Sequence, residues 1–566
     1  MLIATENESK RSLGHWWSSG EPWIWLNAAA VGISITAVVG LLLLIAVKGF
    51  AHFWPADVTQ ISYTELTAQG PQPRVVYGEI VEEDSIVLQQ YLESGGDSSV
   101  IEEGQENVTR WLIKTGNRRI NPPDFRWIVE NQIQNRVAPS GIAVIERLEW
   151  GNAYGKPVRL TRQNNAVVEG DGVWGALQED FARAEEIRSQ IEEIEQGVLN
   201  TLNYELEGLR LDRRRAELDD RRDRIPEIDG EVANIRAEYA VEEARLRELY
   251  KVLEGQSLTL ATATGSEINV PLSEILRSWQ PNDMSTGTKL AHYFSSIWRF
   301  LSEDPREANT EGGIFPAIFG TVLMVLLMSL LVTPFGVIAA LYLREYARQG
   351  PLVRLIRIAV NNLAGVPSIV YGVFGLGFFV YFLGGNLDQL FFAESLPAPT
   401  FGTPGLVWAS LTLALLTVPV VIVSTEEGLT RIPRSLREGS LALGATKAET
   451  LFKVVLPMAS PSILTGVILA VARAAGEVAP LMLVGVVKLA PTLPLDGNFP
   501  YLHLERKFMH LGFHIYDVGF QSPNVEAARP LVYATALLLV IIIVVLNLTA
   551  ITLRGRLERR YRGVES

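Results

Sequence analysis

Six long runs of apolar residues punctuate the sequence. They lie at about residues 23–47, 314–343, 360–383, 404–424, 460–487 and 531–553. Each run has roughly twenty or more residues, which is the length that an α-helix needs to cross the hydrocarbon core of a bilayer. The pattern therefore predicts a mainly α membrane protein with six transmembrane helices.

The segment between the first two runs, residues 48–313, follows another pattern. Short β-rich stretches broken by Gly, Pro and Asn fill residues 57–171 and return at 257–270. Between them, residues 177–253 repeat apolar positions at steps of three and four in two halves, with Pro226 and Gly230 disturbing the middle. This spacing predicts a heptad seam on each half. We therefore expect an α+β insert that contains an antiparallel coiled-coil hairpin, whose turn the sequence does not place.

Two interpretations of the predicted hairpin remain open. It is either a solvated spacer or a docking arm for a partner on the same side of the membrane. The spacer interpretation is favoured, because the charged faces of coiled coils are usually just solvated.

The placement of Lys and Arg predicts the orientation. Basic residues gather in the loops after the second and fourth runs and in the tail after the sixth, whereas the loop after the third holds Asp388 and Glu394 and no Lys or Arg. Because cytoplasmic loops are enriched in basic residues, tails 1–22 and 554–566 and loop 425–459 are predicted to be cytoplasmic, and residues 48–313 periplasmic. The net charge of −13 argues against a nucleic-acid partner. The absence of cysteine excludes disulfides and thiolate sites.

Within loop 425–459, the stretch EGSLALGATKAETLFKVVLP stands out. It runs from Glu438 to Pro457 and mixes apolar with charged residues. It predicts two short helices that break near Gly444 and end before Pro457. A compact amphipathic element of this kind suits a cleft on another protein. The alternative is an ordinary basic connecting loop.

This stretch resembles the cytoplasmic loop of importer-type ABC permeases, whose pattern is EAA-x3-G-x9-I-x-L-P. Glu438-Gly439-Ser440 stands for EAA, Gly444 for the glycine and Val454-Val455-Leu456-Pro457 for the end. The resemblance implies that the loop couples the chain to a separate ATPase. The coupling residues it implies are Glu438, Gly439, Ser440, Ala442, Gly444, Ala445 and Pro457.

No phosphate-binding loop of the form G-x4-G-K-[ST] occurs in the chain. The chain is therefore expected not to be an enzyme and to bind no cofactor or metal of its own. ATP and Mg²⁺ would be used by the partner ATPase.

The fifth run contains two charged residues, Arg473 and Glu477. Four positions apart in a helix, they would share one face, and a charge at the centre of a membrane helix costs about 2.5–3.5 kcal/mol on insertion scales. Gly476 and Pro480 would loosen the helix beside them. One interpretation is an anion path in which the arginine offers a forked set of donors to a tetrahedral oxyanion. The other is a structural ion pair between helices.

The third run opens with residues that disfavour a helix. Gly365, Pro367 and Gly372 are predicted to break it and expose backbone N–H groups, and Ser368 adds a hydroxyl to this candidate substrate path. The alternative is that the glycines simply let helices pack closely.

Two further stretches narrow the resemblance. AGVPSIVYGVFGLGFFV at 364–380 and ARAAGEVAPL at 472–481 resemble the PstA-type permeases of phosphate importers. The resemblance covers residues 314–553 and the first run but not the long insert. It implies import of inorganic phosphate by alternating access in the bacterial inner membrane. It also implies a PstC-type second permease, two PstB-type ATPase subunits and a periplasmic PstS-type binding protein as partners.

Two alternatives stay open beside this interpretation. One is a permease for another oxyanion, such as sulfate or molybdate. The other is a transporter subunit whose insert mainly serves signalling or assembly.

Overall fold

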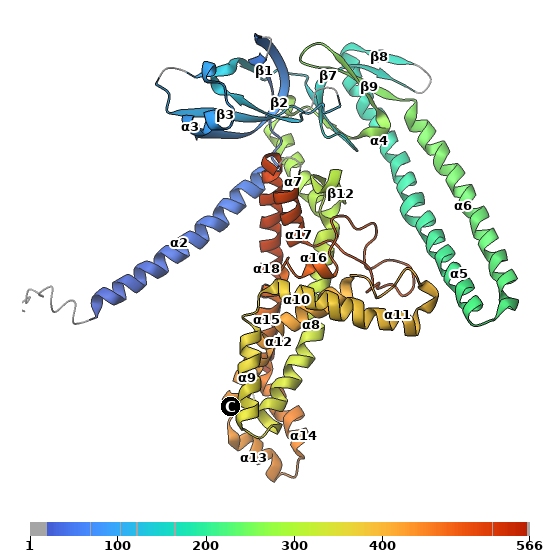
Figure 1. The fold of residues 1–566 in the computed structure, drawn as a ribbon. Helices are drawn as coiled ribbons and strands as arrows, with labels where there is room; N and C mark the ends of the chain where they lie inside the picture. The colour runs from blue at the N-terminus through green and yellow to red at the C-terminus, as the bar shows by residue number, and fades with distance from the viewer. Residues whose placement is uncertain are drawn as a thin grey trace, which may run out of the picture.

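The computed structural model describes residues 20–67, 70–101, 104–119, 123–162, 166–522 and 525–562. Nearly all of the predicted tail 1–22, and the last four residues of the tail 554–566, lie outside this range. A strand-rich part lies at one end of the molecule, a bundle of long helices extends from it, and a helical hairpin runs beside the bundle (Figure 1).

Six helices among the described residues are long and apolar enough to cross a membrane, as predicted. They are Pro22–Ala51, Phe315–Tyr346, Ser368–Phe391, Leu406–Arg431, Lys447–Gly476 and Ala528–Arg556. Two of the predicted spans had the wrong bounds. The third span begins at Ser368 instead of residue 360, and the fifth covers 447–476 instead of 460–487.

The centre of the bundle is formed by three helices, α8 (Phe315–Leu341), α12 (Leu406–Arg431) and α15 (Leu456–Gly476). Their contact surfaces form one buried apolar cluster, in which Met324, Leu413 and Ala470 are fully buried. Close approach of α8 and α12 requires Gly336, because a Cβ there would lie 2.6 Å from the Val421 side chain. Such small residues are what membrane helices use for close packing.

The third span lies differently from the others. It consists of α10 (Ser368–Phe374), a π-helical stretch (Gly375–Gly384) and α11 (Gly385–Phe391), and it runs crosswise to α8 and α12 (Figure 1). The last span, within α18 (Val525–Arg562), packs on α15 and α2 (Glu21–Ala51).

Helix α2 diverges from the bundle along most of its length (Figure 1). Near its end, Gly49 approaches α18 so closely that a Cβ would lie 3.0 Å from the carbonyl oxygen of Tyr533. The long apolar surface of α2 is therefore left to lipid or to another subunit.

Two antiparallel sheets make up the strand-rich part. The first has the order β4-β3-β2-β1-β5, and the second has the order β10-β9-β7-β6-β11 with β8 beside β7. Strands occur in both stretches that we predicted to be β-rich, 57–171 and 257–270. The strands are β1 Val58–Thr67, β2 Gly70–Val87, β3 Asn107–Lys114, β4 Phe125–Val129, β5 Ile133–Val137, β6 Ala143–Arg147, β7 Ala153–Thr161, β8 Val167–Glu169, β9 Ser257–Ala261, β10 Glu267–Pro271 and β11 Ile275–Trp279.

The hairpin interrupts the second sheet between β8 and β9. Its first arm is α4 (Val173–Glu192), a π-helical stretch (Glu193–Leu199) and α5 (Asn200–Leu218), and its second arm is α6 (Ile225–Glu254). The arms pack through buried Ile194, Leu199 and Leu202. The turn lies at residues 219–224, so Pro226 and Gly230 do not disturb the middle. Pro226 lies in the first turn of α6, where its missing N–H costs nothing.

Charged side chains join the strand-rich part to the start of α8. Arg306 contacts Glu146 of β6, Glu303 contacts Arg277 of β11, and Arg118 Nη1 lies 2.9 Å from Glu307 Oε2. Between β11 and this junction, α7 (Thr286–Ser302) returns the chain to the bundle. The insert is thus attached to the second span by several ion pairs.

Candidate translocation path and coupling surface

A break in the backbone precedes the third span. Helix α9 (Pro351–Leu363) ends, residues 364–367 are not helical, and α10 starts at Ser368. Pro367 lacks an N–H and disfavours a helical conformation at the residue before it, so the chain reorients here. The hydroxyl of Tyr371 donates a 2.6 Å hydrogen bond to the Leu363 carbonyl, which ties the two sides of the break together. Gly365, Pro367 and Ser368 therefore all lie at this break.

A second break follows Arg473 in the fifth span. Helix α15 ends at Gly476, and Glu477 has the extended angles φ −78° and ψ 130°. Our expectation that Arg473 and Glu477 share a face of one continuous helix was wrong. Pro480 cannot donate the hydrogen bond that would continue the helix, and it restricts the residue before it. A short helix, α16 (Leu481–Val484), resumes after the break.

The two breaks lie against each other. A Cβ on Gly372 would lie 2.7 Å from the Cα of Pro480, so only glycine lets α10 approach the second break this closely. Gly372 itself lies inside α10, and the prediction that it breaks the helix was wrong. Because it lacks a side chain, it serves close packing. Gly375, one turn on, meets Thr412 of α12 in the same way.

Arg473 and Glu477 form a loose ion pair at this junction. The Nε of Arg473 lies 3.5 Å from Glu477 Oε1, and the two side chains are 35% and 21% exposed. Tyr371 lies within electrostatic range of Arg473. A guanidinium has five N–H donors, and one long contact to a carboxylate leaves capacity for a further anion. The guanidinium of Arg473 thus has donors beyond its contact with Glu477 that could hold an anion.

The predicted coupling segment forms two helices at the far end of the bundle from the sheets (Figure 1). Helix α13 (Arg434–Ala442) carries Glu438, Gly439 and Ser440, and α14 (Lys447–Thr450) begins after Ala445. Gly444 joins them with φ +87°, in the left-handed region that favours glycine. The hydroxyls of Ser440 and Thr450 lie 2.9 Å apart and link the two helices.

We expected the second helix of this segment to end before Pro457, but it does not. The chain continues through a π-helical stretch (Leu451–Val455) directly into α15, where Pro457 lies in the first turn. The irregular stretch before it leaves no regular α-helical hydrogen bond for the proline to break. We call residues 434–455 the coupling knob.

The coupling knob is fixed to the end of α8 and α12. Arg437 Nη2 lies 3.0 Å from Glu345 Oε1 and also donates to the Leu429 carbonyl, while Lys447 donates to the carbonyl of Glu345. Beneath these polar contacts, Leu429, Leu451 and Val455 are buried in one apolar cluster. Its outer surface is unusually apolar, since Leu443 is 90% exposed and Phe452 is 66% exposed. Such a patch is typical of a protein interaction site.

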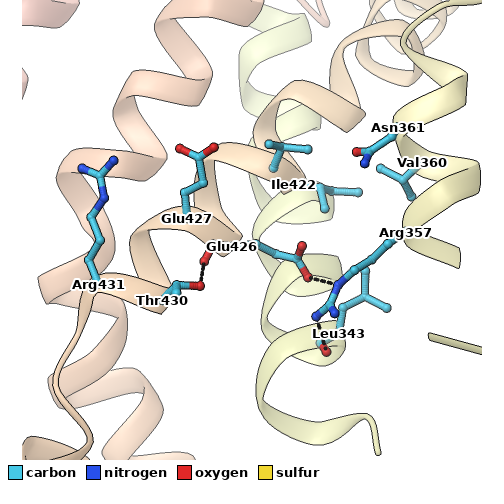
Figure 2. A pocket seen from close by; sticks show the side chains of 10 residues that line it. Leu343, Arg357, Val360, Asn361, Ile422, Glu426, Glu427, Thr430 and Arg431 are labelled. Carbon is cyan, nitrogen blue, oxygen red and sulfur yellow. Dashed lines mark hydrogen bonds and ion pairs between the residues drawn. The ribbon is translucent and has the colours of Figure 1, made fainter. Parts of the chain in front are cut away.

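A cavity of about 400 Å³ lies beside the coupling knob, between α9 and α12 (Figure 2). Arg357 crosses it and pairs with Glu426, with Nε 3.2 Å from Oε1. Glu427 and Arg431 lie on the opposite side from Asn361 (Figure 2). The polar lining indicates that water reaches this end of the bundle. No group of three or more side chains suited to a metal ion occurs among the described residues.

Sequence reasoning missed two residues that build these sites. Tyr371 ties the first break together, and Glu345 anchors the coupling knob. Glu345 could have been noticed as the one acidic residue in the basic stretch 344–359. The sequence did not indicate the role of Tyr371, because a tyrosine in an apolar run most often only packs against neighbouring side chains.

Comparison with known proteins defines the class first. Residues 332–563 match the family of binding-protein-dependent transport system inner membrane components. A chain from a solved structure of the MetNI methionine ABC transporter matches 43% of this chain and 94% of its own length, with 19% identity and a TM-score of 0.32.

Permeases of phosphate transport systems share a higher sequence identity with this chain. The phosphate transport system permease protein PstA of Mycobacterium leprae is 36% identical over 254 residues, which cover 44% of this chain and 74% of that protein. PstA of Yersinia pestis is 33% identical over 45% of this chain and 77% of its own length. The chain belongs to the PstA family of phosphate transport permeases.

Proposed function

We propose that the chain is a permease subunit of an ATP-driven importer of inorganic phosphate. The observation that carries the proposal is its identity to PstA permeases over the part that holds both helix breaks and the coupling knob. In this proposal, phosphate passes the junction of the two breaks, where the guanidinium of Arg473 binds it. Glu477 holds the arginine when the path is empty and accepts the proton of hydrogen phosphate. Ser368 adds a hydroxyl donor at the start of α10.

ATP hydrolysis occurs in a separate subunit, because this chain has no phosphate-binding loop. The exposed apolar surface of the coupling knob inserts into that subunit. Movement of the ATPases is transmitted through Arg437 and Lys447 to the end of α8, and the core alternates between states open to either side. The partners are two PstB-type ATPase subunits, a PstC-type second permease and a PstS-type binding protein.

The coupling knob and both termini face the cytoplasm of a bacterial cell, and the sheets and hairpin lie in the periplasm. The distribution of Lys and Arg supports this orientation. So does α7, because its exposed Leu290, Phe294 and Trp298 recur every four residues and form an apolar stripe. Trp54, just after the first span, packs against Tyr293 of α7 with ring centroids 5.9 Å apart. Aromatic side chains of this kind favour the membrane–water boundary.

The test is uptake of labelled phosphate by vesicles that contain the complete transporter, with sulfate and molybdate as competitors. Uptake that requires ATP, ignores the competitors and is lost in Arg473→Gln would support both the substrate and the role of the arginine. Uptake that survives Arg473→Gln would make Arg473 and Glu477 a structural ion pair. Strong competition by another oxyanion would overturn the phosphate assignment and leave a permease for that anion.

A further inference from the structure

The hairpin lies against the core of its own chain. Arg215 of α5 contacts Glu394, which follows the third span, and the hydroxyl of Tyr204 donates to the carbonyl of Phe499. The ring of Tyr204 also meets that of His503, with centroids 5.9 Å apart. Helix α5 therefore touches two loops of the core, 393–395 and 494–503.

On the core side, the hairpin contacts a buried carboxylate and a loop that is held by its own side-chain interactions. The Glu394 side chain is only 9% exposed, and a buried carboxylate needs a cation or hydrogen-bond donors to remain charged. In loop 494–503, the two ring nitrogens of His503 lie 3.0 Å from Asp496 Oδ1 and 3.2 Å from Glu505 Oε1. The loop is thus held in shape from within, independently of the hairpin.

The two attachments of the hairpin differ in kind. At its root, Val173, Leu177 and Leu253 are buried with Leu258 and Leu260 of the sheet. Against the core, no buried apolar cluster among the described residues contains side chains from both the hairpin and the bundle. Polar interfaces without an apolar centre are typical of parts that come together and separate.

The hairpin completes a ring of attached elements. Its root is fixed to the sheets, and the Arg306–Glu146 and Arg118–Glu307 pairs fix the sheets to residues 306–307, in the segment that leads into α8. Helix α5 returns to the loops at 393–395 and 494–503. A helix is stiff, so while α5 is attached it fixes the distance between the start of α8 and these loops. Any movement that changes this distance must open the ring at its weakest attachment, the polar contact of α5.

We propose that the α5–α6 hairpin is a strap that holds the outer loops of the permease at rest and releases them in each transport cycle. The proposal rests on the proposed function only in that the chain is taken as a transporting permease. It assigns to the insert a mechanical role in the same chain.

The chain has no cysteine, so an introduced cysteine pair supplies its only thiols and can be cross-linked without competing thiols of this chain. The first pair is Arg215→Cys with Glu394→Cys, joined by a reducible bifunctional thiol reagent in the complete transporter in vesicles. The matched control is Arg213→Cys with Asp229→Cys, which joins α5 to α6, since these side chains lie 3.4 Å apart in the native chain. The control fixes the hairpin to itself and leaves the core free.

We expect ATP-dependent uptake to be lost when α5 is cross-linked to the core and to return on reduction, while the control keeps uptake in both states. Unchanged uptake with α5 cross-linked would overturn the strap. If the first pair does not assemble, Tyr204→Cys with Phe499→Cys decides the question in the same way. If the uncross-linked complex imports another oxyanion instead of phosphate, the proposed substrate fails, while the comparison of cross-linked with reduced samples still tests the strap.

Discussion

The coupling knob and the hairpin are both attached to the core by arginine–glutamate pairs, but only the knob also shares an apolar cluster with the core. Arg437 pairs with Glu345 above buried Leu429, Leu451 and Val455. Arg215 pairs with Glu394, and no buried apolar cluster of the described residues lies beneath that pair. An ion pair alone contributes little net stability, while buried apolar side chains contribute about 1.5–3 kcal/mol each. The knob is therefore built as a permanent part of the bundle, and the hairpin as a part that can leave it.

The largest effect is expected at the turn of the coupling knob. Gly444→Asp should abolish phosphate uptake while the complex still assembles, because it adds a side chain at φ +87° and a charge on the surface that we propose binds the ATPase. Uptake and ATPase activity are measured together in vesicles. Gly230→Ala, at an open position inside α6 and outside the knob, is the control and should transport normally. ATPase activity still fully coupled to uptake in Gly444→Asp would refute the role of the knob.

Thermal stability tests whether the apolar cluster beneath the coupling knob holds the knob to the bundle. Leu429→Ala removes a fully buried side chain and should cost about 2–5 kcal/mol, seen as a clear drop in the thermal unfolding temperature of the purified chain. Leu443→Ala, at an exposed position, should leave that temperature unchanged and weaken ATPase binding instead. Equal temperatures for both variants would mean that the cluster does not hold the knob.

The two arginines can be compared directly. Arg437→Gln removes a contact to Glu345 and leaves partly buried carbonyls without their donor, so uptake should fall strongly. Arg215→Gln should cost about 1 kcal/mol or less and leave uptake near that of the parent, because the strap must open in any case. Uptake assays on both variants at equal expression provide the measurement. A stronger defect in Arg215→Gln than in Arg437→Gln would reverse the assignment of fixed and detachable parts.

The smallest effect is a pH dependence of the hairpin contact. Burial raises the pKa of Glu394, but its backbone hydrogen bond and Arg215 outweigh this and hold the pKa below its ordinary value of 4.5. A lowered pKa means that the contact is fully formed above pH 4.5 and is lost as the pH falls through the lowered value. Spin labels on Arg222→Cys and Phe499→Cys should therefore move apart below pH 4.5. In Glu394→Gln the distance should no longer change over this range, and a persisting change would exclude Glu394 as its origin.

The sequence predicted the spans and the two short helices joined at Gly444, because both depend on local patterns. An apolar run of sufficient length indicates a span, and a glycine between two short amphipathic stretches indicates the break between the helices. Hydropathy could not place the break at Glu477, because the residues on both sides of it are equally apolar. The backbone chemistry of Gly476 and Pro480 decides it, and that signal was in the sequence but was given too little weight.

The contact between the hairpin and the core could not be predicted at all. Arg215 and Glu394 are 179 positions apart. Arg215 is one of many charged residues in its helix, and nothing in the loop of Glu394 indicates which cation would reach it. Only the fold brings them together. The solvated surface that we expected for the hairpin is real along much of α6, but α5 is partly covered by its own core.

One further consequence follows from Glu345, which holds the coupling knob at the end of α8. The opposite end of α8 begins at the segment that carries the ion pairs to the sheets, and 27 helical residues make a rod of roughly 40 Å between the two. The knob and the insert are thus attached at opposite ends of the same helix. In the proposed orientation, a tilt imposed at the knob would move the sheets, so a fluorescent label on the insert should report from the periplasmic side how the proposed ATPases move the knob.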